Sequence, residues 1–383
     1  MGNNYRSDGI NIIKCLACFF VPALHYYVNW GYMDRIVHLS NNMILEMSFR
    51  WLFFSCIGLY IMCTGYLSIN KEFNKKYYLK LIRTVIVFLL ICILTVIIKE
   101  QSTGIDFVRK LCGFFFQYTG YFWYMGFYIG FYIIIPFINI MINSMGRRMH
   151  MYFIIALLLI TAIPPFVNWM PPVFTWKYFY LPSYWEQFFP LTYYVIGAYL
   201  KRYNPHIFKP LVIGGIIVVP IAISAFECWV NNGKQVVFIG GGYGSIITVT
   251  ISVALFLLLY NINISNKKIS GIVAYLASLT LYSYLFLLVS DKYTRIIMGK
   301  ICLQDILPFK YMLVEVCLNY ILSLVLAIMM DRFIFVLMKI FIKTKYYFDR
   351  KKNTLVDVEK NVRVVLIQQL SDKIAHNNSK HRE

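Results

Sequence analysis

Long apolar runs alternate with short polar connections along most of the chain. Runs of about 17 to 25 apolar residues are long enough to cross the hydrocarbon core of a bilayer as helices. We predict spans at residues 10–27, 51–67, 81–98, 121–142, 151–169, 187–200, 208–230, 243–260, 272–289 and 311–342. The pattern indicates an all-α fold, a polytopic membrane helical bundle with about ten transmembrane helices.

Composition agrees with this pattern and excludes a soluble protein of the same length. Apolar residues make up 60% of the chain and charged residues 14%, which leaves too little polar surface to cover soluble domains. The nine cysteines are scattered, and those inside the apolar runs are interpreted as small packing residues. We therefore expect neither a disulfide framework nor a metal site.

The net charge of +20 is interpreted through its position along the chain. With the N-terminus in the cytoplasm, every second connection lies in the cytoplasm, and each of these connections is basic, as the positive-inside rule requires. The residues concerned are Lys71, Lys75, Lys76, Arg147, Arg148, Lys201, Arg202, Lys267 and Lys268. The charge predicts topology and contact with membrane lipids rather than nucleic-acid binding, and an even number of spans places both termini in the cytoplasm.

Two regions differ in composition. Residues 1–343 form the predicted transmembrane domain, and residues 344–383 form a basic cytosolic tail, interpreted as a short amphipathic helix with a disordered end. The opening MGNNYRSDG lacks the cleavage signal of a secretory peptide, so we expect the first span to stay in the mature protein. No internal repeat of the kind found in many transporters is visible.

Two ionisable residues, Lys14 and His25, lie inside the first predicted span, where charge is costly. Eleven residues turn a helix by about 1100°, so both side chains leave the same face, about 16 Å apart along the axis. Each residue alone is also explained by snorkelling or by a hydrogen bond to a neighbouring helix. Together they predict a polar stripe, in which His25 suits proton abstraction and Lys14 supplies a fixed positive charge.

Several segments carry a family resemblance. The stretch NIIKCLACFFVPALH, which ends at His25, resembles the first helix of the acyltransferase-3 family of bacterial membrane O-acyltransferases, with a basic residue, ten residues and then His. FFSCIGLYIMCTGYL resembles the second helix of that family, and the KLIR segment from Lys80 to Arg83 resembles its RxxR element. Residues 123–139 and 194–201 are similar to one branch of the family. Lys14 and Lys80 stand where Arg is commonest, which keeps the charge without the bidentate geometry.

The resemblance implies a membrane-bound O-acyltransferase in a bacterial cell membrane. It would transfer an acyl group from cytoplasmic acyl-CoA, acetyl-CoA in particular, to a hydroxyl of a cell-surface polysaccharide or lipid-linked glycan. Acyl-CoA is then a co-substrate, and no cofactor is permanently bound. His25 would act as general base or carry the acyl group, and Lys14 would lie beside the pantetheine arm. Lys80 and Arg83 would hold the CoA phosphates, although both also suit positive-inside anchors.

An acid that orients His25 is expected near the outer ends of the last two spans. Glu315 shares a helical face with Asn319, four residues later, which makes an inward polar stripe plausible. Asp291 is a second candidate, for orienting His25 or contacting the acceptor, but its position favours a solvated charge at the end of a helix. Glu315 is therefore the preferred catalytic acid.

Three further residues are candidates for binding the acceptor. Trp123 and Tyr124 are suited to stacking on a sugar, although aromatic residues at a helix end are more often interfacial anchors. Arg50 opens the second span on the outer side and would contact an acceptor phosphate or a lipid headgroup.

Two non-enzymatic hypotheses remain open at this level. The polar stripe would also suit a flippase or exporter of a lipid-linked glycan, but the missing repeats and the position of His25 argue against this function. A membrane module that regulates glycan assembly through its basic tail is the other hypothesis. The buried Lys14 and His25 argue against a purely structural role.

Overall fold

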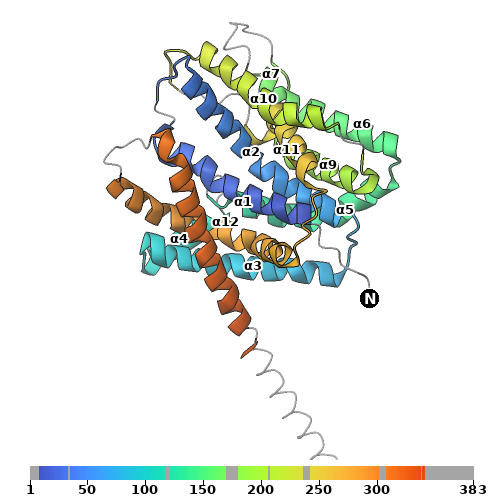
Figure 1. The fold of residues 1–383 in the computed structure, drawn as a ribbon. Helices are drawn as coiled ribbons and strands as arrows, with labels where there is room; N and C mark the ends of the chain where they lie inside the picture. The colour runs from blue at the N-terminus through green and yellow to red at the C-terminus, as the bar shows by residue number, and fades with distance from the viewer. Residues whose placement is uncertain are drawn as a thin grey trace, which may run out of the picture. The chain divides into compact units, whose positions relative to one another are not determined.

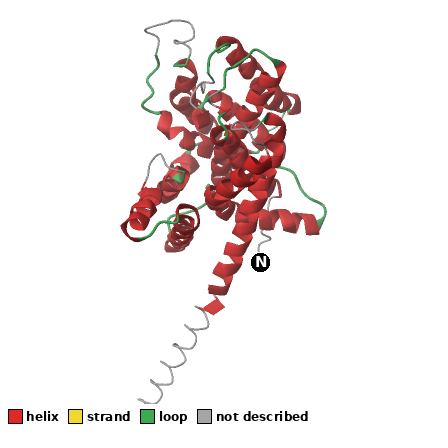
Figure 2. Cartoon of the chain, turned by 90° about the vertical axis from the view of Figure 1, so that its left-hand side faces the viewer, coloured by secondary structure: helices red, strands yellow, loops and turns green. Residues whose placement is uncertain are grey.

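Helices and their connections make up the described part of the molecule (Figures 1 and 2). The computed structural model describes residues 8–32, 35–116, 121–169, 180–205, 208–235, 242–301, 308–337 and 339–340. Within these residues the only extended pairing is an isolated antiparallel bridge between Ile36 and Gln235. The all-α prediction is confirmed. The chain divides into two compact units, Met1–Ala327 and Ile328–Glu383, and the predicted tail, 344–383, lies outside the described residues.

The helices have defined bounds. They are α1 (Asp8–Asn29), α2 (Asn41–Ser68), α3 (Lys75–Thr95), α4 (Gly104–Phe116), α5 (Trp123–Ser144), α6 (Arg147–Leu157), α7 (Ile163–Val167), α9 (Phe189–Tyr203), α10 (Lys209–Val230), α11 (Ile246–Leu259) and α12 (Lys267–Ile301). A last helix occupies Phe309–Leu337. Single π-helical turns extend α3 through Val96–Glu100 and join α6 to α7 through Leu158–Ala162.

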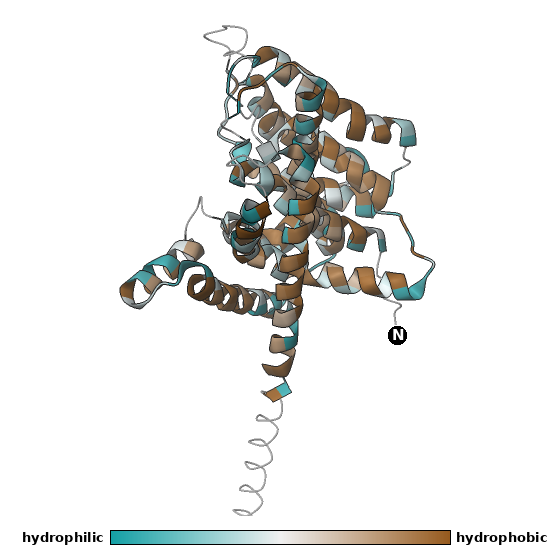
Figure 3. Cartoon of the chain, turned by 60° about the vertical axis from the view of Figure 1, so that its left-hand side comes forward, coloured by the Kyte–Doolittle hydropathy of each residue, from teal (hydrophilic) through white to brown (hydrophobic). Residues whose placement is uncertain are grey.

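Apolar residues run along most of these helices, and polar residues gather at their ends (Figure 3). Among the described residues, eight helices are long and apolar enough to cross a membrane. The shorter helices α9 and α11, with 15 and 14 residues, occupy the remaining two predicted spans. Within the described residues each predicted span thus lies on a helix, and the protein is a polytopic helical bundle. The total of ten spans and the cytoplasmic termini stay predictions.

Two elements differ from the sequence-based expectation. The apolar run predicted at 272–289 is part of a 35-residue helix, α12, which continues to Ile301 and places Asp291 inside a helix rather than at its end. The polar connection after α3 contains an additional helix, α4, whose charged residues interrupt the apolar pattern. In both places amphipathic turns follow an apolar run, and hydropathy alone does not distinguish such turns from a loop.

Helices α2 and α9 pack with their backbones in direct contact. A Cβ atom on Gly65 would lie 2.2 Å from the carbonyl oxygen of Tyr194, and one on Gly197 would lie 2.2 Å from that of Met62. Small residues allow helices in a membrane to approach this closely, which increases dispersion contacts. Gly65 on α2 and Gly197 on α9 therefore allow the two helices to cross with their backbones in contact.

Helices α1 and α12 run parallel and in register. Asp8 accepts hydrogen bonds from Ile264 N at 2.9 Å and Ser270 Oγ at 2.6 Å, which ties the start of α1 to the start of α12. Further along, the thiols of Cys15 and Cys18 donate weak hydrogen bonds to α12 carbonyl oxygens. This pairing determines which α12 residues face the C-terminal end of α1.

Candidate active site

The centre of the site is a contact between α1 and α12. His25 Nδ1 lies 3.0 Å from Asp291 Oδ2, although 266 positions separate the two residues in the chain. The His25 side chain is 23% exposed and the Asp291 side chain 9% exposed. The pair is therefore largely enclosed by the bundle, while the imidazole keeps some access.

Asp291 is surrounded by hydrogen-bond donors. Its Oδ1 accepts from Asn319 Nδ2, and its Oδ2 accepts from Asn29 Nδ2 at 3.3 Å and Tyr121 Oη at 3.1 Å, in addition to the His25 contact. Only an ionised carboxyl group can accept from so many donors without donating itself. A carboxylate at Nδ1 favours the imidazole tautomer that carries its proton there, which leaves Nε2 as the basic nitrogen.

Tyr121 is the third member of this cluster. Its hydroxyl oxygen lies 3.0 Å from His25 Nδ1, and the two rings meet edge-on with centroids 4.8 Å apart. The residue lies in the connection before α5, and its hydroxyl donates to Asp291 Oδ2 at 3.1 Å. The phenol is thus a neutral donor to Asp291.

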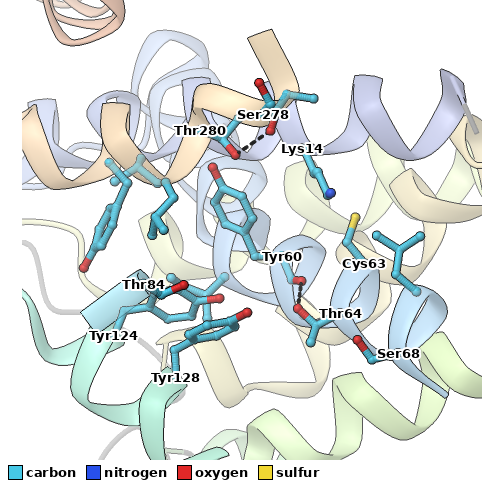
Figure 4. A pocket seen from close by; sticks show the side chains of 16 residues that line it. Lys14, Tyr60, Cys63, Thr64, Ser68, Thr84, Tyr124, Tyr128, Ser278 and Thr280 are labelled. Carbon is cyan, nitrogen blue, oxygen red and sulfur yellow. Dashed lines mark hydrogen bonds between the residues drawn. The ribbon is translucent and has the colours of Figure 1, made fainter. Parts of the chain in front are cut away.

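Lys14 lies in a partly open cavity of about 350 Å³ between α1, α2, α3, α5 and α12 (Figure 4). Figure 4 shows its ammonium group directed into the space beside Cys63. In the described part of the chain no carboxylate forms an ion pair with Lys14. The cavity therefore contains an uncompensated positive charge, which suits an anionic or carbonyl-bearing ligand.

Hydroxyl groups line much of this cavity. They belong to Tyr60, Thr64, Ser68, Thr84, Tyr124, Tyr128, Ser278, Thr280 and Tyr284. Val21, one turn before His25 on α1, also lines the cavity. Tyr284 donates a hydrogen bond to the Tyr121 carbonyl oxygen at 3.2 Å, which connects the cavity wall to the cluster around His25. The predicted stripe on α1 thus borders the cavity at Lys14 and approaches Asp291 at His25.

A basic recess of about 450 Å³ adjoins the cavity, because Ser68 lines both. Its cationic residues come from the α2–α3 connection and the first turns of α3, and are Lys71, Lys75, Lys76 and Lys80. Of the two residues predicted to hold phosphates, Lys80 lines this recess, whereas the exposed Arg83 does not. The lysines before Lys80, which sequence reasoning assigned to topology alone, complete the recess.

The predicted acceptor-binding residues have different surroundings. Arg50 is fully buried, and its Nη2 donates to both carboxylate oxygens of Glu227 at 2.8 and 2.9 Å, while Trp51 Nε1 donates to the same carboxylate. Tyr124 lines the cavity that contains Lys14, and Trp123 packs against Tyr243 with ring centroids 5.7 Å apart. The structure therefore does not bring Arg50 and Trp123 to His25.

Glu315, the preferred catalytic acid, is buried near the pair but does not contact His25. Its carboxyl interacts electrostatically with Asp291, and Asn319, one turn later, donates to Asp291. Asp291 occupies the orienting position that the sequence analysis assigned to Glu315. The sequence analysis did not assign this role to Asp291 because the residue directly follows an apolar run. A charged residue in that position is typical of a solvated helix end.

The described residues contain no group of three or more His, Cys, Asp or Glu side chains arranged to hold a metal ion. Within the described residues the site therefore consists of a histidine–aspartate pair, a partly buried phenol and a hydroxyl-lined cavity with one free ammonium group. A histidine oriented in this way suits general base catalysis, and the cavity suits an elongated polar ligand.

The fold defines a multi-pass membrane protein, and its candidate site joins a histidine to an aspartate inside the bundle. The family model for the acyltransferase domain of acyltransferase-3 proteins matches residues 7–337, most of the chain, so the protein belongs to that family and the predicted resemblance is confirmed. The protein is accordingly a membrane acyltransferase. No curated protein and no solved structure matches the chain.

Proposed function

We propose that the protein transfers an acyl group, acetyl in particular, from cytoplasmic acyl-CoA to a hydroxyl of a cell-surface polysaccharide or lipid-linked glycan in the bacterial plasma membrane. The contact between His25 Nδ1 and Asp291 Oδ2 is the observation that carries this proposal. It leaves Nε2 of His25 to act on the acceptor. Family membership supplies the reaction class.

The donor is proposed to enter from the basic recess. Its phosphates would lie among Lys71, Lys75, Lys76 and Lys80, and its amide-bearing arm would extend into the cavity past Lys14. The cavity hydroxyls offer donors and acceptors to the two amides of that arm, and the ammonium of Lys14 would stabilise a carbonyl oxygen or phosphate. The thioester would then reach the end of α1 where His25 lies.

In the proposed chemical step His25 is the only residue needed to accept and return the proton. His25 Nε2 removes the proton of the acceptor hydroxyl while its oxygen attacks the thioester carbonyl carbon. The carbon–sulfur bond breaks, and the imidazolium returns the proton to the departing thiolate, giving an ester and free CoA. Asp291 stabilises the imidazolium that forms in between.

The His25→Ala variant tests the proposal. We expect acylation of the surface glycan to fall by at least about 10²-fold, as is usual when a general base is removed, with normal protein level and normal glycan export. Mass analysis of the surface polysaccharide measures acylation. His38→Ala is the matched control, since His38 is an exposed histidine in the α1–α2 connection, and it should acylate normally.

Unchanged acylation in His25→Ala cells would refute the enzymatic proposal. Loss of glycan export with normal acylation of the remaining glycan would instead support a transporter.

A further inference from the structure

A second recess lies beside the basic recess, between the α2–α3 connection and the C-terminal part of α5. Its volume is about 570 Å³, in the size range of small-molecule binding sites. Lys71 lines both recesses, and Ser68 lines both the basic recess and the cavity that contains Lys14. Three neighbouring spaces therefore lead from the cavity to this second recess. Its lining residues are Asn70, Lys71, Glu72, Phe73, Pro136, Asn139, Ile140 and Asn143.

The two recesses differ in charge. Four lysines and no carboxylate line the basic recess within the described residues. The second recess has one charge of each sign, Lys71 and Glu72, and is called the neutral recess below. A carboxylate repels phosphate, so phosphate groups suit the basic recess and an uncharged group suits the neutral recess.

The connection that carries these side chains is held against α5 by hydrogen bonds. Asn139 Nδ2 donates to the carbonyl oxygens of Ser68 at 2.6 Å and Lys71 at 2.8 Å. Asn143 Nδ2 donates to the carbonyl oxygen of Ile69 at 3.1 Å. The wall of the neutral recess is therefore formed before a ligand arrives, which reduces the entropy cost of binding.

Phe73 contributes a largely uncovered aromatic ring to the neutral recess, since the residue is 64% exposed. The rings of Tyr78 and Phe137 cross it at 67° and 55°, with centroids 5.4 and 5.7 Å away, so neither lies parallel to it. An uncovered aromatic face suits stacking on a planar base. Phe73 belongs to the polar stretch NKEFNKK, residues 70–76, and therefore lies among side chains that a polar ligand can reach.

Hydrogen-bonding side chains accompany this ring. Asn70 and Glu72 line the same recess, and within the described residues neither side chain has a partner. An amide both donates and accepts, and a carboxylate accepts. Adenine offers an amino donor beside a ring-nitrogen acceptor, the pattern that an asparagine amide recognises in nucleic acids. The neutral recess therefore combines a stacking surface with polar groups that match an adenine ring.

We propose that the neutral recess binds the adenine ring of the acyl donor, with Phe73 stacked on the base. The inference rests on the proposed acyl transfer from acyl-CoA. CoA consists of a base, a group of phosphates and an amide-bearing arm, and the neutral recess, the basic recess and the cavity follow one another in the same order. A thioester carried on a protein-bound phosphopantetheine would lack the contact with Phe73.

The Phe73→Ala variant tests this subsite, because it removes the ring from an exposed position and leaves no cavity in the core. Equilibrium binding to purified protein in detergent is measured for CoA and for phosphopantetheine, which has the same arm and a phosphate but no adenosine. We expect the Kd for CoA to rise about tenfold, the loss typical of one stacked base. The Kd for phosphopantetheine should stay unchanged.

Two further variants provide controls. Phe208→Ala removes a ring that is 66% exposed but lines neither recess, so both Kd values should match the wild type. Lys80→Met is the matched contrast, since Lys80 lines the basic recess but not the neutral recess, and both ligands carry phosphate. Both Kd values should rise in that variant.

An unchanged Kd for CoA in Phe73→Ala would assign the ring to anchoring in the headgroup layer and would overturn the inference. An equal rise for both ligands would assign the ring to the fold or to the phosphate site, and would also overturn it. Failure of the proposed function is distinguishable, because wild-type protein would then bind neither ligand, or would bind CoA while His25→Ala cells acylate their glycan normally.

Discussion

At the scale of single residues, the orientation of the His25 ring depends on three atoms that meet at mutual distances of 3.0 to 3.1 Å. These are His25 Nδ1, Asp291 Oδ2 and Tyr121 Oη. Tyr121 donates to Asp291 and therefore restrains the carboxylate that holds the imidazole. We infer that the phenol is a positioning residue, since it acts on His25 through Asp291.

A double-mutant cycle checks this role. We expect Tyr121→Phe to lower kcat for glycan acylation about tenfold, the value of a hydrogen bond to a charged group, without changing the KM for acetyl-CoA. In an Asp291→Asn background the same change should lower kcat by less than about twofold, because the restrained carboxylate is already absent. Steady-state rates of the four proteins measure the coupling.

Tyr194→Phe is the control for loss of a buried phenol hydroxyl, since Tyr194 donates to Asn139 Oδ1 at 2.6 Å, away from His25. Its kcat should match the wild type. Independent effects of Tyr121→Phe and Asp291→Asn would contradict a role through the carboxylate.

The candidate site was partly predictable at this scale. Periodicity placed Lys14 and His25 on one face of a single helix, because eleven residues bring a helix back to nearly the same direction. The partners of His25 were not accessible in this way, since Asp291 and Tyr121 are 266 and 96 positions away in the chain. Only the packing of α1 against α12 and the α5 connection brings them together.

At the scale of helices, the α2–α9 crossing leaves no room for a side chain at Gly65 or Gly197. We expect Gly65→Ala to destabilise the protein by about 1–3 kcal/mol or more, because the new Cβ must displace a carbonyl group. Thermal unfolding in detergent measures the change. Gly130→Ala is the control, since a Cβ on this α5 glycine meets nothing within 4 Å. An equal effect of the two substitutions would contradict the direct backbone contact.

The Arg50–Glu227 ion pair connects α2 to α10 and gives a second prediction. Arg50→Met alone should destabilise the protein by about 3–5 kcal/mol, because it leaves a buried carboxylate without its cation. Arg50→Met combined with Glu227→Leu should recover most of that stability and retain glycan acylation. Unfolding and acylation assays check both parts. If the stable double variant loses its affinity for the glycan, Arg50 contacts the acceptor, as the sequence analysis expected.

The elements themselves were largely predictable, because a bilayer requires long apolar helices whose lengths follow from its thickness. The sequence pattern predicted every observed span but not α4 or the last turns of α12. These turns carry charged residues such as Asp291 and Lys292, and polar residues end an apolar run without ending a helix. Hydropathy indicates which segments are apolar enough to lie in lipid. A helix continues as long as its backbone hydrogen bonds are formed, whether its side chains are apolar or charged.

At the scale of the whole molecule, the proposed reaction has a direction across the membrane. The lysine-lined recess lies at the start of α3, on the side predicted to be cytoplasmic, and His25 lies near the opposite end of α1. We expect sealed inverted membrane vesicles to use added acetyl-CoA for glycan acylation, and right-side-out vesicles to do so only after permeabilisation. Acylation by intact right-side-out vesicles would contradict the predicted topology.

The parallel pairing of α1 with α12 has a consequence for biosynthesis. His25 enters the membrane with the first helix, but Asp291 arrives with a helix that is synthesised only after residue 267. Until that helix inserts, the imidazole has no carboxylate at Nδ1 and the N-terminal Asp8 has no anchor. An unfinished or truncated chain therefore carries no assembled His25–Asp291 pair, and under the proposed mechanism it would not catalyse acyl transfer until the bundle is complete.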